Sequence, residues 1–322
     1  MQMQLAILVF LVSYILIATE KINRVAVALG GAAAMIVIGA TDADAIFYDH
    51  DTGIDWNVIF LLLGMMIIVG VIHKTGLFEY LAIKAIKKAK GEPKRALVFL
   101  IILTAAASAI LDNVTTILLA VPMTLVVCKQ LNVSPIPFIL SQVFASNIGG
   151  ASTLVGDPPN IIIASRANLS FNDFLVHMAP WVIVVMMVIT PMLVFMFRKE
   201  LVNTAADRAR IDKLDEKSYL KDKVLLKKSL FVLGAVMIAF VLHTALHLEP
   251  SIVAMLGAGV LVGISRLKPK DYAMDVEWAT LVFFAGLFIM VGALVKTGAL
   301  GEFADFLKEQ VGDQASLAAM VL

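Results

Sequence analysis

Two short polar clusters interrupt the apolar middle of the chain: DNVTT at residues 112–116 and SNIGGASTLVGDPPN at residues 146–160. In a soluble protein, such clusters would be ordinary loops. In a membrane, polar side chains and Gly or Pro breaks at bilayer depth are costly unless they are buried in protein or line a cavity. The meaning of the two clusters therefore depends on whether the chain crosses a membrane.

The composition favours a membrane protein. Hydrophobic residues make up 60% of the 322-residue chain, and charged residues make up 16%. A soluble domain has about 45–50% apolar and about 25% charged residues. The apolar residues come in long blocks, and a spanning helix needs roughly 20 of them. The sequence therefore predicts an all-α polytopic protein of the cell inner or plasma membrane.

The apolar blocks lie on both sides of one long hydrophilic stretch. We expect this stretch, residues 198–228, to be a cytoplasmic linker. Residues 1–197 then form a first membrane repeat, and residues 229–322 form the start of a second. The expected spans are 5–18, 25–40, 56–72 and 181–197 before the linker, with a hairpin at 96–127 and a broken helix at 136–164, and 230–245, 252–264 and 279–295 after it, followed by an apolar patch at 315–322.

Two of the expected segments are not ordinary helices. The run of about 32 residues from 96 to 127 would be about 48 Å long as one helix, which is too long for a single crossing. We therefore expect a re-entrant hairpin with its tip at residues 112–116. The run from 136 to 164 contains Gly149-Gly150 and GDPP at 156–159. Because Pro cannot continue a helix and Gly weakens one, this run predicts a discontinuous helix with an unwound middle.

An internal repeat relates the two halves of the chain. The features Asp55-Trp56, Gly64, Gly70 and Lys74-Thr75-Gly76 recur 222 positions later, without a gap, as Glu277-Trp278, Gly286, Gly292 and Lys296-Thr297-Gly298. The positive-inside rule puts the basic 73–95 loop and the linker in the cytoplasm, with the acidic 41–55 loop outside. The two copies then cross in opposite directions. Such an inverted-topology repeat is typical of secondary transporters that bind their cargo at the repeat interface.

The repeat also predicts what should come after the second copy. A partner of the DNVTT cluster would fall near position 334, and a partner of the 156–160 break near position 378, whereas the chain ends at Leu322. We therefore expect an incomplete second repeat, and a fragment that lacks the second half-site and does not transport by itself.

The carboxylates of the two clusters have two open interpretations. An acidic group at membrane depth indicates a proton or cation relay. Asp112 also suits a helix N-cap, and Asp157 before two prolines suits an ordinary turn. Similarly, Ser146 and Asn147 either bind an ion or form a plain helix–helix hydrogen bond.

The candidate binding residues are the polar and glycine residues of both clusters. The ends of a broken helix carry partial charge, hydroxyl and amide groups suit ions of either sign, and glycines let backbone N–H groups approach a ligand. The candidates for binding substrate or ion are Asp112, Asn113, Thr115, Thr116, Ser146, Asn147, Gly149, Gly150, Ser152, Thr153, Asp157 and Asn160.

These clusters, together with Pro122 between them, resemble the ion transporter superfamily. Within it they resemble ArsB/NhaD-type permeases with a citrate-transporter-like, P-protein-like domain. The resemblance implies a scaffold and a transport domain with two re-entrant hairpins and two broken helices. It also implies that the tip at Asn113, Thr115 and Thr116 and the bend at 146–153 contact the substrate or a coupling ion. That ion would be H⁺ or Na⁺, with Na⁺ at the Asn113 and Asn147 clusters as one option.

The tip departs from the Ser-Asn-Thr that the resemblance associates with dicarboxylate carriers, because it reads Asp112-Asn113-Val114-Thr115. This departure favours the arsenite or the sodium/proton branches over di- or tricarboxylate carriers, and we expect first a secondary active permease that moves arsenite or a related oxyanion by alternating access. The alternatives are a sodium/proton antiporter that uses Asp112 and Asp157, a di- or tricarboxylate (citrate-type) carrier, and a non-transporting fragment or assembly partner.

The sequence also limits the partners that we expect. It contains no Walker A, HExxH or GxSxG motif, so we expect neither an enzyme nor a resident cofactor or metal centre. With a net charge of +1 and no basic stripe with interleaved aromatic residues, we expect no nucleic-acid partner. The expected partners are the lipid bilayer and a small ion, and a homodimer and a separate ATPase subunit remain open.

Overall fold

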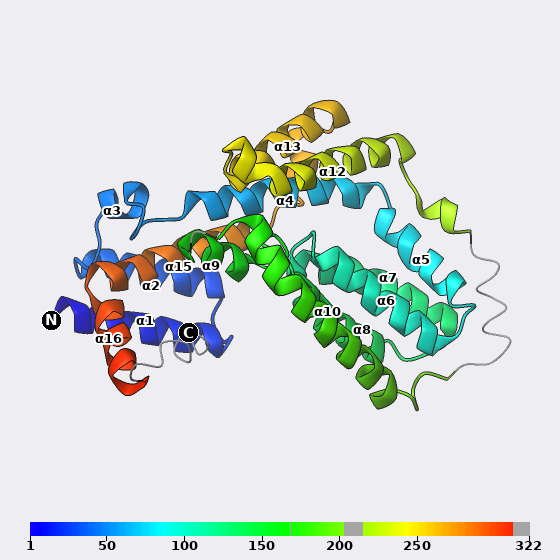
Figure 1. Cartoon of the computed structure of the whole chain (residues 1–322), viewed down its shortest axis with the longest axis horizontal. Coiled ribbons are helices and arrows are strands. Elements are labelled where there is room, and N and C mark those ends of the chain that lie inside the picture. The colour runs from blue at the N-terminus through cyan, green and yellow to red at the C-terminus, as the bar shows by residue number, and fades with distance from the viewer. Residues whose placement is uncertain (168, 203–214, 312–322) are drawn as a thin grey trace. The chain divides into compact units, whose positions relative to one another are not determined.

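The computed structural model describes residues 1–167, 169–202 and 215–311, and within this part of the chain every regular element is a helix (Figure 1). The middle of the expected linker and the apolar patch at 315–322 lie outside the described residues. Helices that are long and apolar enough to cross a membrane are α4 (Trp56–Lys74), α7 (Asn113–Leu131), α10 (Phe171–Met196), α12 (Lys223–Leu246) and α15 (Trp278–Lys296). The expected all-α, polytopic membrane protein is therefore confirmed.

The other helices are shorter. Three of them are apolar, namely α1 (Gln2–Ala18), α2 (Arg24–Val37) and α13 (Pro250–Ser265). The remaining described helices are α3 (Ala43–Tyr48), α5 (Leu77–Lys88), α6 (Pro93–Ser108), α8 (Ile136–Gly150), α9 (Pro158–Ala167), the 3₁₀ turn η1 (Glu216–Tyr219), α14 (Pro269–Ala273) and α16 (Ala299–Val311).

The chain forms two compact units, one from residues 1–59 with 277–322 and one from residues 60–276. In the first unit, α15 packs along α2, and α1 packs against both (Figure 1). A Cβ at Gly286 of α15 would lie 2.9 Å from the carbonyl carbon of Ala28 in α2, so these two backbones touch. Around this contact, Met35, Met290 and Ala293 form a buried core.

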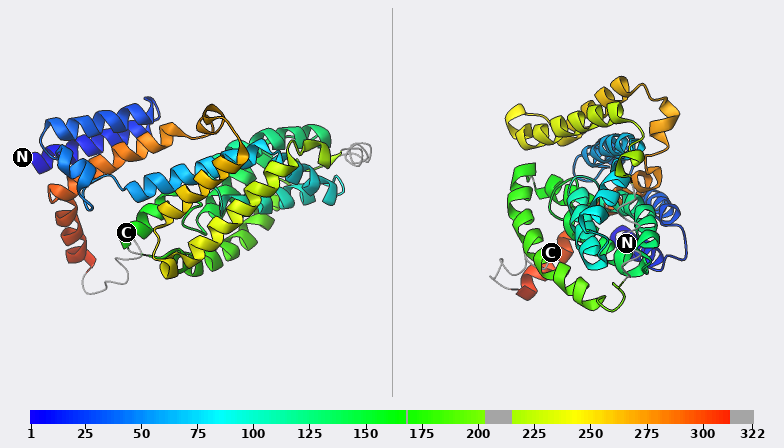
Figure 2. Two further views of the ribbon diagram at one scale, coloured as in Figure 1. Left: turned by 90° about the horizontal axis from the view of Figure 1, so that it is seen from above. Right: turned by 90° about the vertical axis from the view of Figure 1, so that its right-hand side faces the viewer.

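The second unit is built around α6, α7 and α8. These three helices pack on one another, and α10 covers α6 and α8 (Figure 2). Their shared apolar core includes Leu97, Leu100, Leu131 and Phe138, each at most 1% exposed. Leu97, Leu131 and Phe138 pack the three helices together at the ends away from the polar clusters.

The two sequence copies also have the same local structure. Both α4 and α15 are 19 residues long and run from Trp to Lys. Each is followed by a glycine with positive φ, +79° at Gly76 and +81° at Gly298, and then by another helix. The two helices thus agree in length and in the glycine that follows each of them, while the inverted-topology repeat stays a prediction. The opposite crossing directions of the copies and the division of the chain at 198–228 stay predictions.

Each copy packs on a helix of the other copy. α15 lies on α2, as described above, and α4 lies on α13, where a Cβ at Gly64 would be 2.7 Å from the carbonyl carbon of Ala254. Gly64 and Gly286 are equivalent positions of the repeat, and α2 and α13 each lie two helices before the Trp-to-Lys helix of their own copy. The Trp-to-Lys helix of each copy therefore packs on the helix at this equivalent position in the other copy.

Ion pairs also connect the two copies of the repeat. Lys74, the last residue of α4, pairs with Asp275 just before α15 at 2.6 Å. Its equivalent, Lys296 at the end of α15, pairs with Asp42, which precedes α4. The hydrogen bond from Lys296 holds the pKa of Asp42 below its usual value. Both the glycine contacts and the ion pairs therefore join one copy to the other.

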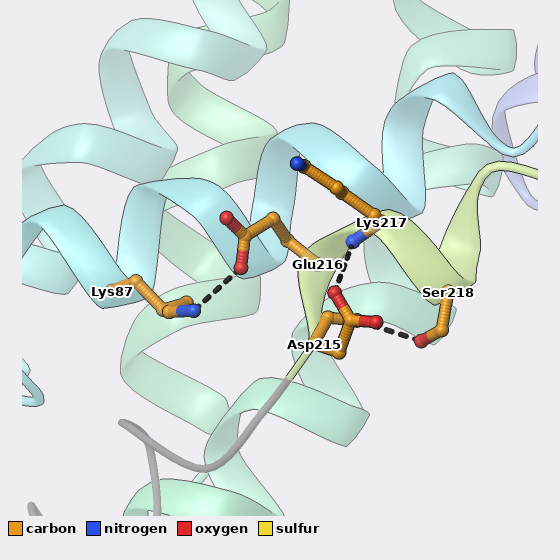
Figure 3. A network of polar contacts seen from close by, with 5 residues as sticks. All are labelled: Lys87, Asp215, Glu216, Lys217 and Ser218. Carbon is orange, nitrogen blue, oxygen red and sulfur yellow. Dashed lines mark hydrogen bonds and ion pairs between the residues drawn. The ribbon is translucent and has the colours of Figure 1, made fainter.

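The part of the expected linker that follows its undescribed middle docks on α5 (Figure 3). Lys87 of α5 forms an ion pair with Glu216 at 2.5 Å, and the backbone N–H of Lys221 donates to the Thr75 carbonyl at 2.9 Å. A Cβ at Gly76 would lie 2.0 Å from the Tyr219 carbonyl oxygen, so only glycine fits there. The hydrogen bond from Lys87 lowers the pKa of Glu216. The ion pair is therefore complete above the usual carboxylate pKa and is lost only as the pH falls through the lowered value.

The reciprocal packing predicts unequal effects of two glycine substitutions. Gly64→Ala places a Cβ against the backbone of α13, and overpacking of this kind costs about 1–3 kcal/mol. Gly234→Ala in α12 is the matched control, because a Cβ there meets no atom within 4 Å. We expect Gly64→Ala to lower the thermal unfolding midpoint of the purified protein and Gly234→Ala to leave it unchanged or raise it. Equal midpoints for the two variants would contradict the contact.

Candidate functional site

The first polar cluster lies where α6 ends and α7 begins. The chain turns at residues 109–112, and Asp112 is the N-cap of α7. Its Oδ1 accepts a hydrogen bond from the backbone N–H of Thr115 at 2.8 Å, and its carbonyl oxygen accepts one from Thr116 at 3.0 Å. The capping role that the sequence left open for Asp112 is thus present. Because an N-cap satisfies free N–H groups, it holds the hairpin tip in one conformation.

The second polar cluster is a break between two helices. α8 ends at Gly150, and α9 begins at Pro158. The Nδ2 of Asn160 donates to the carbonyl oxygens of Gly150 at 3.1 Å and Thr153 at 2.8 Å. Ser152 donates to the Gly149 carbonyl at 2.6 Å. These bonds satisfy carbonyl groups that the end of a helix otherwise leaves without a partner.

The tip and the break are joined by side chains that bond to backbone. Thr153 donates to the Ala109 carbonyl at 2.6 Å and accepts from the backbone N–H of Gly156 at 3.1 Å. Ser146 donates to the Asn113 carbonyl at 3.0 Å. Each bond connects the broken helix to the hairpin or closes the break itself. The two clusters, which are more than thirty residues apart in sequence, therefore form one site.

Two asparagine amides meet at the accessible edge of this site. The Nδ2 of Asn113 donates to the Oδ1 of Asn147 at 3.2 Å, and Asn147 also donates to the Val143 carbonyl at 2.8 Å. Asn147 is exposed, and Asn113 is half-buried. These amides are the parts of the site that a ligand reaches most directly, although the binding role of the candidate residues stays a prediction.

The glycines of the second cluster bring backbone close to backbone. A Cβ at Gly149 would lie 2.3 Å from the Ala105 carbonyl oxygen, and one at Gly150 would lie 2.5 Å from that of Gly156. The sequence predicted that these glycines allow a close approach of the backbone, and in the structure the partner is other backbone of the same protein. This contact seats α8 on α6 and folds the break against the end of α8.

A buried polar layer lies behind the tip, and the sequence reasoning did not find it. Gln142 of α8 donates to Thr104 of α6 at 3.1 Å and accepts from Thr124 of α7 at 2.5 Å. These three residues and Thr116 line a cavity of about 30 Å³, which is large enough for one water molecule. Among the described residues, the buried Thr116 hydroxyl has no hydrogen-bond partner.

The missed residues share a weak sequence signal. Thr104 and Ser108 are one helical turn apart on α6, and Gln142 and Ser146 are one turn apart on α8. Ser108 donates to the Ser146 carbonyl at 2.7 Å. A helical spacing of polar residues inside apolar spans could have indicated that these side chains face each other.

All ionisable side chains near the site are acidic. Residues 96–128 and 131–165 contain Asp112 and Asp157 but no Glu, Lys, Arg or His. Asp157 is half-buried directly before α9, and its carboxylate is within range of electrostatic interaction with Asp112. Within these two segments, positive potential comes from the N-terminal ends of α7 and α9, each with about half a unit charge.

A polar hairpin tip that bonds to a broken helix within apolar sequence is the type of site that secondary membrane transporters use. Comparison with known families agrees: residues 14–322 match the family described as citrate transporter. The chain therefore belongs to the citrate transporter family, and the resemblance to the ion transporter superfamily is confirmed.

Several known proteins are similar to the chain over most of its length. It is 51% identical over 318 residues to the uncharacterized transporter Rv2684 of Mycobacterium tuberculosis, covering 98% of this chain and 74% of the relative. It is 52% identical over 300 residues to the 46 kDa membrane protein of Mycobacterium leprae, covering 93% and 70%. The P protein of Homo sapiens is 30% identical over 377 positions, covering 94% of this chain and 44% of that protein.

The bonds of Thr153 predict a large effect for a nearly isosteric change. Thr153→Val keeps the shape but leaves the Ala109 carbonyl and the Gly156 N–H unpaired, which costs about 1–3 kcal/mol for each buried group. We expect a lower unfolding midpoint and faster proteolysis between α8 and α9. Thr153→Ser is the control, because it keeps the hydroxyl. If both variants behave alike, Thr153 does not join the tip to the break.

Proposed function

We propose that this protein is a secondary transporter that moves a citrate-type carboxylate together with a cation through the joined tip and break. The observation that carries the proposal is the charge of the site. Its two ionisable groups, Asp112 and Asp157, are both acidic, and no basic side chain lies in either polar segment.

We assign the recognition of the cargo's carboxylate oxygens to uncharged groups of the site. The Asn113 and Asn147 amides lie together at the accessible edge, and helix N-termini such as that of α7 favour anions. Such groups give direction and hydrogen bonds, but they do not neutralise a polyanion. Since buried charges need a partner of opposite charge, a multiply charged carboxylate needs a cation that travels with it.

We assign the binding of that cation to Asp112 and Asp157. Oxygen ligands suit H⁺, Na⁺ or a divalent ion such as Mg²⁺, and citrate itself supplies further oxygens to a divalent ion. The family description names citrate, which is compatible with the carboxylate alternative. Arsenite, which the departure at the tip favoured, finds no support in the family or in the names of the relatives.

Sodium/proton antiport is the second candidate, because the two carboxylates lie within electrostatic range of each other. Such a pair can exchange a proton for Na⁺ without an organic cargo. Asp112 also caps α7, so Asp157 is the better residue with which to separate transport from folding. Under antiport, Asp157→Asn abolishes sodium-driven proton movement, and the asparagine amides have no role in cargo recognition.

Flux into liposomes tests the proposal, with a purified full-length version that includes the second half-site expected beyond Leu322. We expect uptake of labelled citrate that depends on Mg²⁺ or on a Na⁺ or proton gradient. Asn147→Ala should reduce it by at least about tenfold, because it removes a hydrogen bond to a charged ligand. Gln130→Ala, at the far end of α7, is the amide control and should leave uptake unchanged. Citrate uptake that needs no cation would contradict the proposal, as would sodium–proton exchange without citrate uptake.

A further inference from the structure

A groove runs along the seam between α6 and α10 in the second unit, where the two helices lie side by side (Figure 1). It consists of two hollows of about 430 Å³ and about 590 Å³, which adjoin because Thr190 and Pro191 line both. The smaller hollow begins at Lys94 and Arg198. The larger one is walled mainly by apolar side chains and reaches Ala109, Gly149 and Ser152 behind the candidate site.

The entrance of the groove is basic. Lys94 lies in the first turn of α6, and Arg198 follows the end of α10. Within the part of the chain that the structure describes, neither side chain forms an ion pair, whereas the neighbouring Arg95 is paired with Glu92 at 2.7 Å. The Arg198 guanidinium lies 4.3 Å from the centre of the Phe195 ring. The N-terminal end of α6 adds partial positive charge at the same place.

The rest of the groove is apolar and open to the expected bilayer. Small residues of α6, Ala105 and Ala106, form one wall, and Met186 and Met187 of α10 form the other. Neighbouring α10 side chains such as Trp181 and Ile183 are 69% and 54% exposed, as expected for a helix that faces lipid. From its entrance inward, the groove is therefore lined first by two basic side chains and then by apolar side chains.

We propose that this groove is a binding site for an anionic phospholipid. The phosphate lies between Lys94 and Arg198, and one acyl chain lies along α6 and α10. The positive-inside rule assigns this end of both helices to the cytoplasmic face, where anionic lipids concentrate and basic pockets between helices bind their head groups. A free phosphate ion would leave the apolar walls uncovered, and an apolar partner would leave the two cations without a counter-charge.

The position of the groove links the lipid to the site. Its inner end is formed by Ala109, which precedes the tip, and by Gly149 and Ser152 of the second polar cluster. An acyl chain there packs against the same backbone that Thr153 holds in place. Lipid binding therefore stabilises the joined arrangement of tip and break, and the purified protein is more stable when the groove is filled.

Native mass spectrometry and thermal unfolding of the full chain in detergent test this site, with phosphatidylglycerol as the probe. We expect bound phosphatidylglycerol and a raised unfolding midpoint. Lys94→Ala combined with Arg198→Ala should weaken binding roughly 30-fold, because each basic side chain near a membrane surface strengthens the binding of an anionic lipid roughly fivefold. Arg95→Ala is the matched control and should not weaken binding, because Glu92 already pairs with that residue.

Two further arms separate the lipid from other occupants. Ala106→Phe fills the apolar wall without touching the cations and should also reduce phosphatidylglycerol binding. Phosphatidylcholine with the same acyl chains, and inorganic phosphate alone, should both bind weakly and leave the midpoint unchanged. Equal binding of phosphatidylcholine, full stabilisation by phosphate, or a groove occupied by a second copy of the chain would overturn the proposal.

Discussion

Backbone groups at bilayer depth have no water to bond with, and this constraint governs the central part of the molecule. A broken helix between Gly150 and Pro158 leaves carbonyl groups that must find partners within the protein. The Asn160 amide donates to two of them, at Gly150 and Thr153. The Thr153 hydroxyl accepts from the Gly156 N–H within the break and donates to the Ala109 carbonyl of the hairpin. The same bonds that make the break tolerable therefore also create the site, because they bring the two polar clusters together.

The reciprocal packing of the repeat copies provides a second level of organisation. Glycines at equivalent positions, Gly64 and Gly286, let α4 and α15 each touch the backbone of a helix from the other copy. Lys74 and Lys296, also equivalent, form ion pairs across the copies. A duplicated sequence thus builds two similar contacts, each inside its own compact unit, and the features that are repeated are the ones that make helix–helix contact.

The sequence was most informative where polar or breaking residues interrupt apolar runs. Helices end or begin at the two clusters, α7 at Asn113, α8 at Gly150 and α9 at Pro158, because Gly, Pro and capping residues act locally. The re-entrant hairpin and the discontinuous crossing stay predictions. The layer of Thr104, Thr124 and Gln142 was missed, because single polar residues within apolar helices do not reveal which neighbour they face. The argument for arsenite depended on Asp112, whose side chain caps α7. Because the capping role requires a residue such as Asp112 whatever the cargo is, its presence does not distinguish one cargo from another.

The central claim is that cargo binds where the hairpin tip meets the broken helix, and chemical protection of Asn147 tests it most directly. In Asn147→Cys, the new thiol lies at the accessible edge, whereas Cys128, the one native cysteine, is buried. The measurement is the rate of modification by a small water-soluble maleimide, with and without citrate and Mg²⁺, at citrate concentrations raised enough to offset the roughly tenfold weaker binding expected when the Asn147 amide is lost. The account predicts slower modification with both present and no change in Gln130→Cys, which lies outside the site. An unchanged rate in Asn147→Cys, in a protein that transports citrate, would contradict it.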